Sequence, residues 1–365
     1  MRKYGLMLLC LLLLLGMSCS ACAEGEWFLF SDSVPEELLF TVNDYTGTVT
    51  LTFLGDCTLG TQDGVSGRAN SFTNLIEEHG MSWPFRNLVS LTAHDDLTVA
   101  NLEGVLTDRS LTKVEKSYNF KGPTAYTEIL HEGSIECVNL ANNHSHDYGT
   151  AGYKDTKAAL TGAEIAFFGE DCVAVWKYQG VRIGFIGAYY ALSGSRYSVY
   201  KKQIALLQQA GCNAIITVMH AGLEHNLNIT PNQRGIAEKA AKLGSCLVVG
   251  HHPHVAQGYE LVDGIPVAYS LGNCSFGGAI HPGDTDSLVL QVELSFEDGE
   301  PVEEVLHFYP ISITGNSKYN DCSPVLLTGK DAARVLKDME TSTGYTMPEF
   351  TEAAGSVVRV SLETE

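Results

Sequence analysis

The most informative stretch of this chain is Val248-Val249-Gly250-His251-His252-Pro253-His254-Val255, an apolar run that ends in three histidines within four positions. Imidazole is the commonest nitrogen ligand of zinc and similar metals, and ligands at the tip of a buried strand are held in a fixed geometry. Gly250 allows a sharp turn there, and Pro253 fixes its own φ. The alternative is a polar loop whose histidines only cap the strand, because folds present polar strand ends with or without a site.

Polar side chains follow other predicted strands at the point where each strand ends. These strands cover residues 49–54, 97–100, 135–140, 213–219 and 265–271. The residues that follow or end them are Asp56, Asn101, Glu103, Asn143, His144, His220, Glu224 and Asn273. Because the carboxyl ends of strands in α/β proteins converge on one crevice, residues distant in sequence can share a site. We therefore expect these side chains and the histidine run to form one cluster.

The chemistry of this set favours a divalent metal ion. Asp, Glu, Asn and His, with no cysteine in a ligand pattern, suit Mn, Fe or Zn and do not suit a structural thiolate zinc site. Two adjacent ions would lower the pKa of a bridging water and hold an oxyanion such as phosphate. The sequence contains no G-x-S-x-G elbow, Walker A loop or dinucleotide fingerprint, which disfavours a serine hydrolase or a nucleotide-binding domain.

The order of predicted elements indicates an α/β fold. Amphipathic helices are expected near residues 151–160, 201–210, 232–243 and 328–340. Strands over residues 173–178 and 181–188 are separated by Gln179-Gly180, which is typical of a hairpin turn. Residues 287–296 and 302–313 alternate like antiparallel strands.

The N-terminus predicts secretion. Arg2 and Lys3 precede an apolar run over residues 6–15, and Ala21-Cys22-Ala23 supplies small residues for cleavage, so residues 1–23 are interpreted as a cleaved signal peptide. A membrane anchor is the alternative, but the run is short of the roughly 20 apolar residues that span a bilayer. Lipid attachment at Cys22 is a second alternative. Residues 24–47 are mixed and acidic, and we expect them to form a leader to the domain.

The formal net charge is −20, and removal of Arg2 and Lys3 with the signal peptide would make it −22. Such a surface repels nucleic acid and anionic lipid, so no nucleic-acid partner is expected. Lys116 and Lys121 stand out in so acidic a chain. They could bind an anionic substrate group, or they could lie in a solvated loop.

At the polar residues that end the predicted strands, the sequence resembles the CapA family, the bacterial poly-γ-glutamate capsule biosynthesis proteins. The domain of that family is similar to the calcineurin-like metallophosphoesterases. The resemblance rests on several short segments in family order between residues 48 and 314. These segments are Phe53-Leu54-Gly55-Asp56, Ala100-Asn101-Leu102-Glu103, Tyr118-Asn119-Phe120-Lys121-Gly122-Pro123, Leu140-Ala141-Asn142-Asn143-His144, His220-Ala221-Gly222-Leu223-Glu224, Gly250-His251-His252-Pro253-His254 and Tyr269-Ser270-Leu271-Gly272-Asn273. The resemblance implies a four-layer α/β/β/α sandwich over residues 48–314, with residues 315–365 as a C-terminal extension packing on it.

The resemblance also implies roles for individual residues. Those that would be metal ligands or their counterparts are Asp56, Glu103, Asn143, His220 and His254. His144 would be the general acid or a phosphate-contacting group. By spacing, His252 and His254 fit a His-x-His pair, whereas Gly250-His251 fits the Gly-His half of the phosphoesterase pattern, and both alternatives stay open. Asn101, Glu224, His251 and Asn273 would complete the site.

This chain departs from the family pattern at a few positions. Ala221 replaces a usual Trp and Cys274 replaces a usual Phe, which changes the expected pocket wall. Thr58 stands where true phosphoesterases have the His of an Asp-x-His opening, so one metal position is expected to be weak or empty.

Three hypotheses follow for the function. The first is a secreted CapA-like protein that makes, exports or attaches an anionic polymer such as poly-γ-glutamate, with membrane proteins of a capsule synthesis complex as partners. The second is a divalent-metal hydrolase acting on a small phosphoester or a γ-glutamyl amide. The third is a non-catalytic envelope module that only binds.

Overall fold

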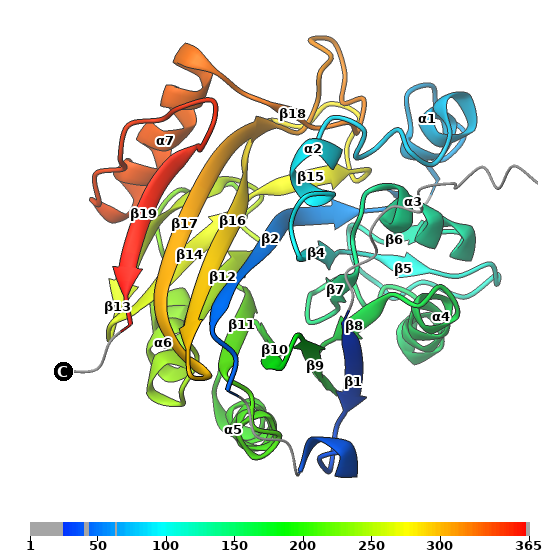
Figure 1. Ribbon diagram of the computed structural model, residues 1–365. Helices are drawn as coiled ribbons and strands as arrows, with labels where there is room; N and C mark the ends of the chain where they lie inside the picture. Colours follow the sequence, from blue (N-terminus) through cyan, green and yellow to red (C-terminus); the bar gives the residue numbers. More distant parts are fainter. Residues whose placement is uncertain (1–24, 40–43, 63, 363–365) are drawn as a thin grey trace, which may run out of the picture.

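The computed structural model describes residues 25–39, 44–62 and 64–362 (Figure 1). The predicted signal peptide, including Cys22, lies outside the described residues. Within the described part of the chain, no helix combines the length and the apolar character needed to cross a bilayer.

The first sheet has seven strands, which are ordered β1-β9-β10-β11-β12-β14-β13. Its core is parallel from β10 to β14, and β1, β9 and β13 join the edges in antiparallel pairing. The strands are β1 (Glu26–Phe30), β9 (Val173–Tyr178), β10 (Val181–Tyr189), β11 (Ala214–His220), β12 (Leu247–His251), β13 (Ala256–Val262) and β14 (Ile265–Leu271).

The second sheet follows the order β18-β17-β16-β2-β4-β7-β8, with β15 beside β2 and β19 beside β17. Its parallel part is β2 (Gly47–Thr58), β4 (Leu97–Leu102), β7 (Cys137–Asn139), β8 (Ala166–Phe168) and β15 (Asn273–Phe276). Its antiparallel part is β16 (Asp286–Glu297), β17 (Glu300–Ser312), β18 (Val325–Leu326) and β19 (Ser356–Ser361). A small third sheet contains β3 (Thr61–Gln62), β5 (Val105–Leu106) and β6 (Phe120–Gly122).

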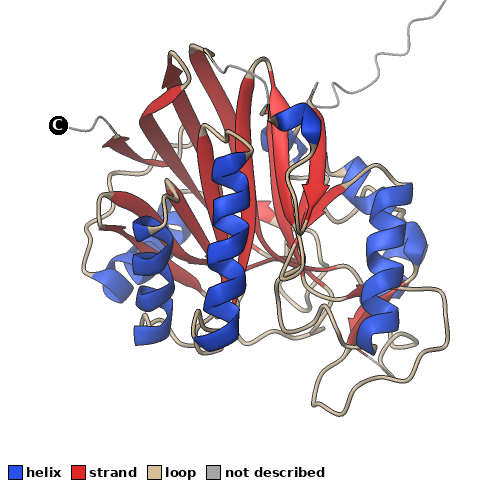
Figure 2. Ribbon diagram, turned by 90° about the horizontal axis from the view of Figure 1, so that it is seen from below, coloured by secondary structure: helices blue, strands red, loops and turns tan. Residues whose placement is uncertain are grey.

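Helices cover the outer faces of the two sheets (Figure 2). One apolar core lies between the sheets, a second joins the second sheet to its helices, and a third joins the first sheet to α5 and α6. The helices are α1 (Phe72–His79), α2 (Val89–Thr92), α3 (Thr127–Glu132), α4 (Gly149–Gly162), α5 (Gly194–Gln209), α6 (Pro231–Lys242) and α7 (Gly329–Thr343), with short 3-10 turns at Glu36–Leu38 and Thr124–Tyr126. The predicted four-layer α/β/β/α arrangement is therefore confirmed.

Both ends of the described chain add strands to the sheets. Within the predicted leader, β1 pairs with β9, from Glu26 opposite Lys177 to Phe30 opposite Val173. Within the predicted C-terminal extension, α7 contacts β13 and β17, and β19 pairs with β17. Residues outside the 48–314 range thus contribute directly to the two sheets.

Local sequence chemistry accounts for several elements. Gln179 and Gly180 both have positive φ, 48° and 100°, as a two-residue turn between β9 and β10 requires. Thr230 caps α6 by accepting from the Gln233 backbone N–H, while the Gln233 side chain accepts from the Thr230 N–H. Helix α5 begins at Gly194, earlier than the predicted start near residue 201.

The strand register brings the predicted site residues to one place. In the second sheet Asp56 is opposite both Asn101 and Asn273, and Asn101 is opposite Asn139. In the first sheet His220 is opposite His251. Because parallel strands end at the same edge, each sheet presents its polar residues as one row.

A buried carboxyl lies in the core between the sheets. Glu304 on β17 alternates in phase with Leu306 and Phe308, so it faces the same core, and neither of its carboxyl oxygens has a hydrogen-bond partner. Burial raises its pKa from the ordinary value of 4.5 to about 8.

This carboxyl predicts a pH-dependent stability. The folded protein retains a proton on Glu304 that the unfolded chain loses above pH 4.5. Its stabilising contribution is therefore complete below that pH and is lost as the pH rises to about 8, at up to about 1.4 kcal/mol per pH unit. Urea unfolding from pH 4.5 to 8 should show the parental slope reduced by this amount in Glu304→Gln and unchanged in Glu300→Gln, an exposed control on the same strand. An identical slope in Glu304→Gln would contradict the assignment.

Candidate functional site

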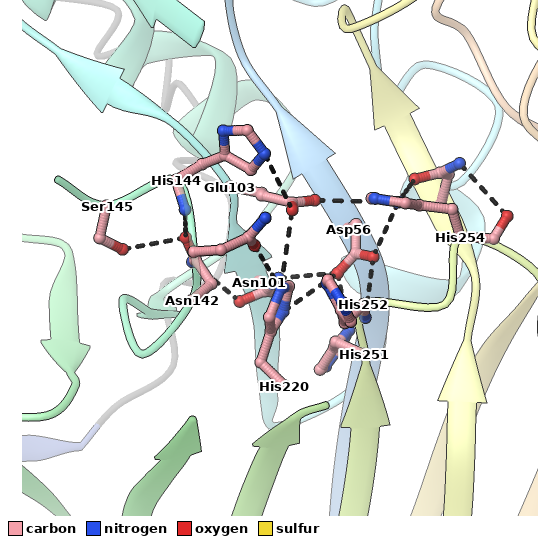
Figure 3. Close-up of polar contacts among 12 residues, drawn as sticks. Asp56, Asn101, Glu103, Asn142, His144, Ser145, His220, His251, His252 and His254 are labelled. Atoms are coloured by element: carbon pink, nitrogen blue, oxygen red, sulfur yellow. Dashed lines mark hydrogen bonds and ion pairs between the residues drawn. The ribbon is translucent and has the colours of Figure 1, made fainter. Parts of the chain in front are cut away.

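Asp56 lies at the centre of a buried cluster at the ends of the strands (Figure 3). Its Oδ1 accepts from the Asn101 side chain at 2.7 Å, and its Oδ2 accepts from the His252 backbone N–H at 3.2 Å. His251 Nδ1 lies 3.3 Å from Oδ1, and His254 Nδ1 lies 3.3 Å from Oδ2. Although burial opposes it, these two histidines hold the pKa of Asp56 well below its usual value.

Glu103 is the second buried carboxylate of the cluster. It is 0% exposed, and neither oxygen has a hydrogen-bond partner within the described structure. Its oxygens lie 3.7 Å from His220 Nε2, 3.9 Å from His144 Nε2 and 4.0 Å from His254 Nδ1. Burial first, and then the negative charge of Asp56, raises the pKa of Glu103 well above its usual value. Such a carboxylate needs a proton or a cation beside it.

Three groups of residues could each hold a metal ion. Within each group, the ligand atoms lie within 4.8 Å of one another. The groups are Asp56 with Glu103 and His254, Glu103 with His220 and His252, and Glu224 with His252 and His254. The first two groups both contain Glu103, so its two carboxyl oxygens could bind metal ions at two neighbouring positions. We call Asp56, Glu103, His220, His252 and His254 the carboxylate–histidine cluster. Its oxygen and nitrogen donors fit a borderline divalent ion.

The chain holds the imidazole of His220 in a fixed orientation. Asn143 Oδ1 lies 2.7 Å from His220 Nε2, and Asn101 Nδ2 lies 3.2 Å from His220 Nδ1. Burial is the main cause that lowers the pKa of His220 well below its usual value, so the ring is neutral, as a metal ligand must be.

His254 is held by Asn273, whose Oδ1 lies 2.8 Å from Nδ1. Although burial opposes it, Glu103 and then Asp56 raise the pKa of His254 to about 10. A proton on His254 and a bound metal cation have the same electrostatic effect, because each compensates the negative charge of the two buried carboxylates. Metal binding should therefore displace a proton from this ring.

The geometry distinguishes His251 from His252. The His252 ring belongs to two of the three ligand groups, whereas His251 belongs to none of them and contacts Asp56. His252 and His254 have positive φ, 99° and 57°, which is uncommon for residues with a side chain. This backbone, with Pro253 between the two residues, places both rings at the cluster.

Asp147 is a site residue that the sequence predictions did not include. Its Oδ2 accepts from His144 Nδ1 at 2.8 Å and from the Phe120 backbone N–H at 2.6 Å. Lys116 forms an ion pair with Asp147 Oδ1 and donates to the Asn143 carbonyl at 2.8 Å. Asp147 lies three residues after His144 in a dense polar run. This density of polar residues is the sequence feature that could have identified it.

The two lysines considered as possible anion-binding groups make different contacts in the structure. Lys116 is engaged by Asp147 beside His144, whereas the Lys121 ammonium lies 5.3 Å from the centre of the Tyr148 ring. Two buried amides, Asn139 and Asn142, were also absent from the predicted set. Both donate to Asn101 Oδ1, at 2.8 and 3.2 Å, and so orient the amide that donates to Asp56.

A cavity of about 390 Å³ opens beside the cluster. Its lining includes His144, His254, Asn273 and Glu224 from the predicted set, together with three aromatic side chains. Glu224 is exposed, unlike the other candidate carboxylates. The cavity therefore gives a solute access to the cluster on this side.

Comparisons with known proteins show which family this chain resembles. A family model described as bacterial capsule synthesis protein PGA_cap matches residues 50–277, a range that includes every candidate from Asp56 to Asn273. A capsule biosynthesis protein CapA from Bacillus anthracis is 25% identical over 291 residues, covering 69% of this chain and 69% of that protein. A PGA biosynthesis protein CapA from Bacillus subtilis (strain 168) is 25% identical over 224 residues, covering 55% of this chain and 59% of that protein.

A solved structure aligns with 68% of this chain and 95% of its own length, at a TM-score of 0.39 and 10% identity. That similarity is too low to establish a shared fold.

Glu103→Gln should separate metal binding from folding. Because burial favours the protonated form of Glu103 when no metal is bound, replacing its carboxyl by an amide should leave the melting temperature in chelator unchanged or higher, while metal binding weakens at least tenfold. Metal at 100 times its dissociation constant should stabilise the parent by about 2.7 kcal/mol and the variant by much less. Calorimetric melting with and without Mn or Zn measures both effects, with Glu136→Gln as a control away from the cluster. A variant that melts lower in chelator but responds fully to metal would refute this role.

Proposed function

This chain belongs to the bacterial capsule synthesis protein family PGA_cap, and on that premise we propose that it is a divalent-metal-dependent hydrolase in the production of an anionic envelope polymer. The observation that carries the proposal is the Glu103 carboxylate, which is fully buried, has no hydrogen-bond partner and lies within 4.0 Å of three histidines. Such a buried carboxyl must either hold a proton or have a cation beside it, and a bound metal ion would supply that cation.

The ion would be Mn, Fe or Zn, held by the carboxylate–histidine cluster with Asn143 beside it. The chemistry that such ions supply is Lewis-acid activation of water and of a substrate oxyanion. The chain itself supplies the orientation, because Asn101, Asn143 and Asn273 hold Asp56, His220 and His254 in place. Hydrogen bonds of this kind fix the tautomer and the direction of each ligand.

His144 is the residue we propose for proton transfer. We assign the proton of the neutral ring to Nδ1, which lies 2.8 Å from Asp147 Oδ2 and 3.1 Å from Lys116 Nζ, and the Nε2 atom faces Glu103. Burial lowers the pKa of His144, so the ring must gain a proton before Nε2 can donate to a leaving-group oxygen. In the neutral state the same atom accepts a proton, and Asp147 stabilises the ring once it is charged.

A phosphoester is the substrate that this chemistry favours, and a γ-glutamyl amide is the alternative. The formal charge of −20 works against binding a long polyanion, so the cluster must overcome that repulsion locally. One curated relative is named for capsule biosynthesis and the other for PGA biosynthesis, which supports a place in making, exporting or attaching poly-γ-glutamate. Membrane proteins of a synthesis complex are the proposed partners.

The proposed location is outside the cytoplasm. The basic start, apolar run and Ala21-Cys22-Ala23 segment support a cleaved signal peptide, with a lipid-modified Cys22 as the alternative. Mass spectrometry of the protein from its native host distinguishes cleavage after Ala23 from lipidation of Cys22.

Elemental analysis tests the metal and the function together. Protein purified without chelator should contain about one to two equivalents of Mn, Fe or Zn and release phosphate from a phosphoester panel. His254→Ala should retain the fold but lose most of the metal and activity, whereas His131→Ala, an exposed histidine on α3, should change neither. Absence of metal from the parent after incubation with all three ions would reject a metal-dependent enzyme. Release of glutamate alone would select the amide alternative.

Asp147→Asn should test the proton-transfer arrangement. Because an amide cannot stabilise a charged His144 as a carboxylate does, kcat should fall by roughly 10²-fold or more with KM little changed. The metal content should stay at the parental value, since Asp147 belongs to none of the ligand groups. A selective rise in KM would instead assign Asp147 to substrate binding.

A further inference from the structure

The cavity beside the carboxylate–histidine cluster is the space available to the part of a substrate that extends from the reacting group. His144, His254 and Asn273 form its inner wall, and its volume of about 390 Å³ is that of a small-molecule site. Its remaining lining should therefore reveal the chemistry of that part of the substrate.

The floor of the cavity is aromatic and rigidly packed. The rings of Phe120 and Phe276 lie 6.1 Å apart at an angle of 73°. Phe120 packs 4.4 Å from the His144 ring, and Phe276 packs 5.4 Å from the His254 ring. A Cβ atom on Gly278 would lie only 2.4 Å from Phe276 Cζ, so the backbone closes tightly over this floor.

A third aromatic side chain lies at the mouth of the same cavity. Tyr118 lines the cavity and is 54% exposed, whereas Phe120 is 4% exposed. An exposed large aromatic residue next to an apolar floor offers a ring face to a solute. Aromatic faces carry negative charge density, which attracts the slightly positive C–H groups on the face of a sugar ring.

Apart from His254, which belongs to the carboxylate–histidine cluster, the charged groups that line the cavity are carboxylates. Glu224 and Asp284 line it, and no Lys or Arg does so in the described structure. One oxygen of Asp284 accepts from the Asp286 backbone N–H at 2.9 Å, and its second oxygen can accept from another donor. A chain of glutamate carboxylates would meet repulsion here, whereas hydroxyl groups can donate to Glu224 and Asp284 and accept from His225 or His281.

The loop that forms the outer wall is held in place. Buried Asn320 donates from its side chain to the carbonyls of Phe276, at 2.7 Å, and Ala279, at 3.1 Å. Its backbone N–H donates to the Ile280 carbonyl at 2.8 Å. The cavity is therefore a preformed site, which lowers the cost of ordering it around a ligand.

We propose that this cavity binds a neutral, hydroxyl-rich sugar ring whose phosphate lies at the carboxylate–histidine cluster, so that the substrate is a sugar phosphate. This inference rests on the hydrolase function proposed above. Hydrolysis would form a bond between phosphorus and a water oxygen and break the bond between phosphorus and the sugar oxygen. One proton would pass from the water to that sugar oxygen, which gives inorganic phosphate and the free sugar.

Calorimetric binding to the metal-loaded protein tests the proposal with three probes, glucose 6-phosphate, glycerol 3-phosphate and penta-γ-glutamate. Glucose 6-phosphate should bind at least tenfold more tightly than glycerol 3-phosphate, which has the same phosphate without the ring. Penta-γ-glutamate should bind more weakly than glucose 6-phosphate even at low salt. Equal affinity for the two phosphates, or preference for the glutamate oligomer, would overturn the proposal.

Variants show whether this cavity causes the preference. Tyr118→Leu and Asp284→Asn should each reduce the ratio of the two phosphate affinities severalfold, and Tyr118→Phe should retain it. Tyr190→Leu is the matched control, because Tyr190 is 62% exposed but does not line the cavity. If Tyr118→Leu and Asp284→Asn both keep the parental ratio, the sugar binds elsewhere and the proposal fails.

Phosphate release, measured in parallel, separates this inference from the proposed function. Selective binding of glucose 6-phosphate without phosphate release would support the sugar site and reject the hydrolase. Release at equal efficiency from both phosphates would support the hydrolase and reject the sugar site.

Discussion

The burial of two carboxylates at one point is the constraint on which the site depends. Asp56 and Glu103 are both fully buried, and like charges so placed are disfavoured unless positive charge accompanies them. Four histidines, His220, His251, His252 and His254, come close to one or both of these carboxylates from the first sheet and its loops. The surrounding amides fix the orientation of these groups, so the cluster is rigid before any ion enters.

The cluster exists because the two sheets touch where their strands end. The Asp56 backbone N–H donates to the Gly272 carbonyl at 2.9 Å, and a Cβ on Gly55 would lie 2.4 Å from that same oxygen. Gly250 makes a similar approach within the first sheet, since a Cβ there would lie 2.0 Å from the Tyr269 carbonyl oxygen. Glycine at position 55 lets strands from the two layers approach closely, and Gly250 does the same for neighbouring strands of the first sheet, so that their side chains form one site.

The cluster and the cavity beside it call for different parts of a substrate. Buried carboxylates and histidines suit a cation and, with it, an oxyanion, whereas the cavity presents aromatic rings and carboxylates. A molecule with a compact anionic group on a neutral polar ring satisfies both. An acidic protein can therefore bind an anionic substrate. Only the anionic group of that substrate has to approach the cation, and the neutral ring is not repelled by the negative charge of the protein.

The sequence by itself determined the α/β class, the strand ends that carry site residues and the cluster of Asp, Glu and His, because hydrophobic periodicity and turn chemistry are local properties. The resemblance to a known family supplied the four-layer arrangement. Only the tertiary structure decided that Asp147 holds His144, that Lys116 pairs with Asp147 while Lys121 lies over the Tyr148 ring, and that His252 rather than His251 joins the ligand groups. These outcomes depend on register and on the approach of two sheets, which are set by packing between residues far apart in the chain.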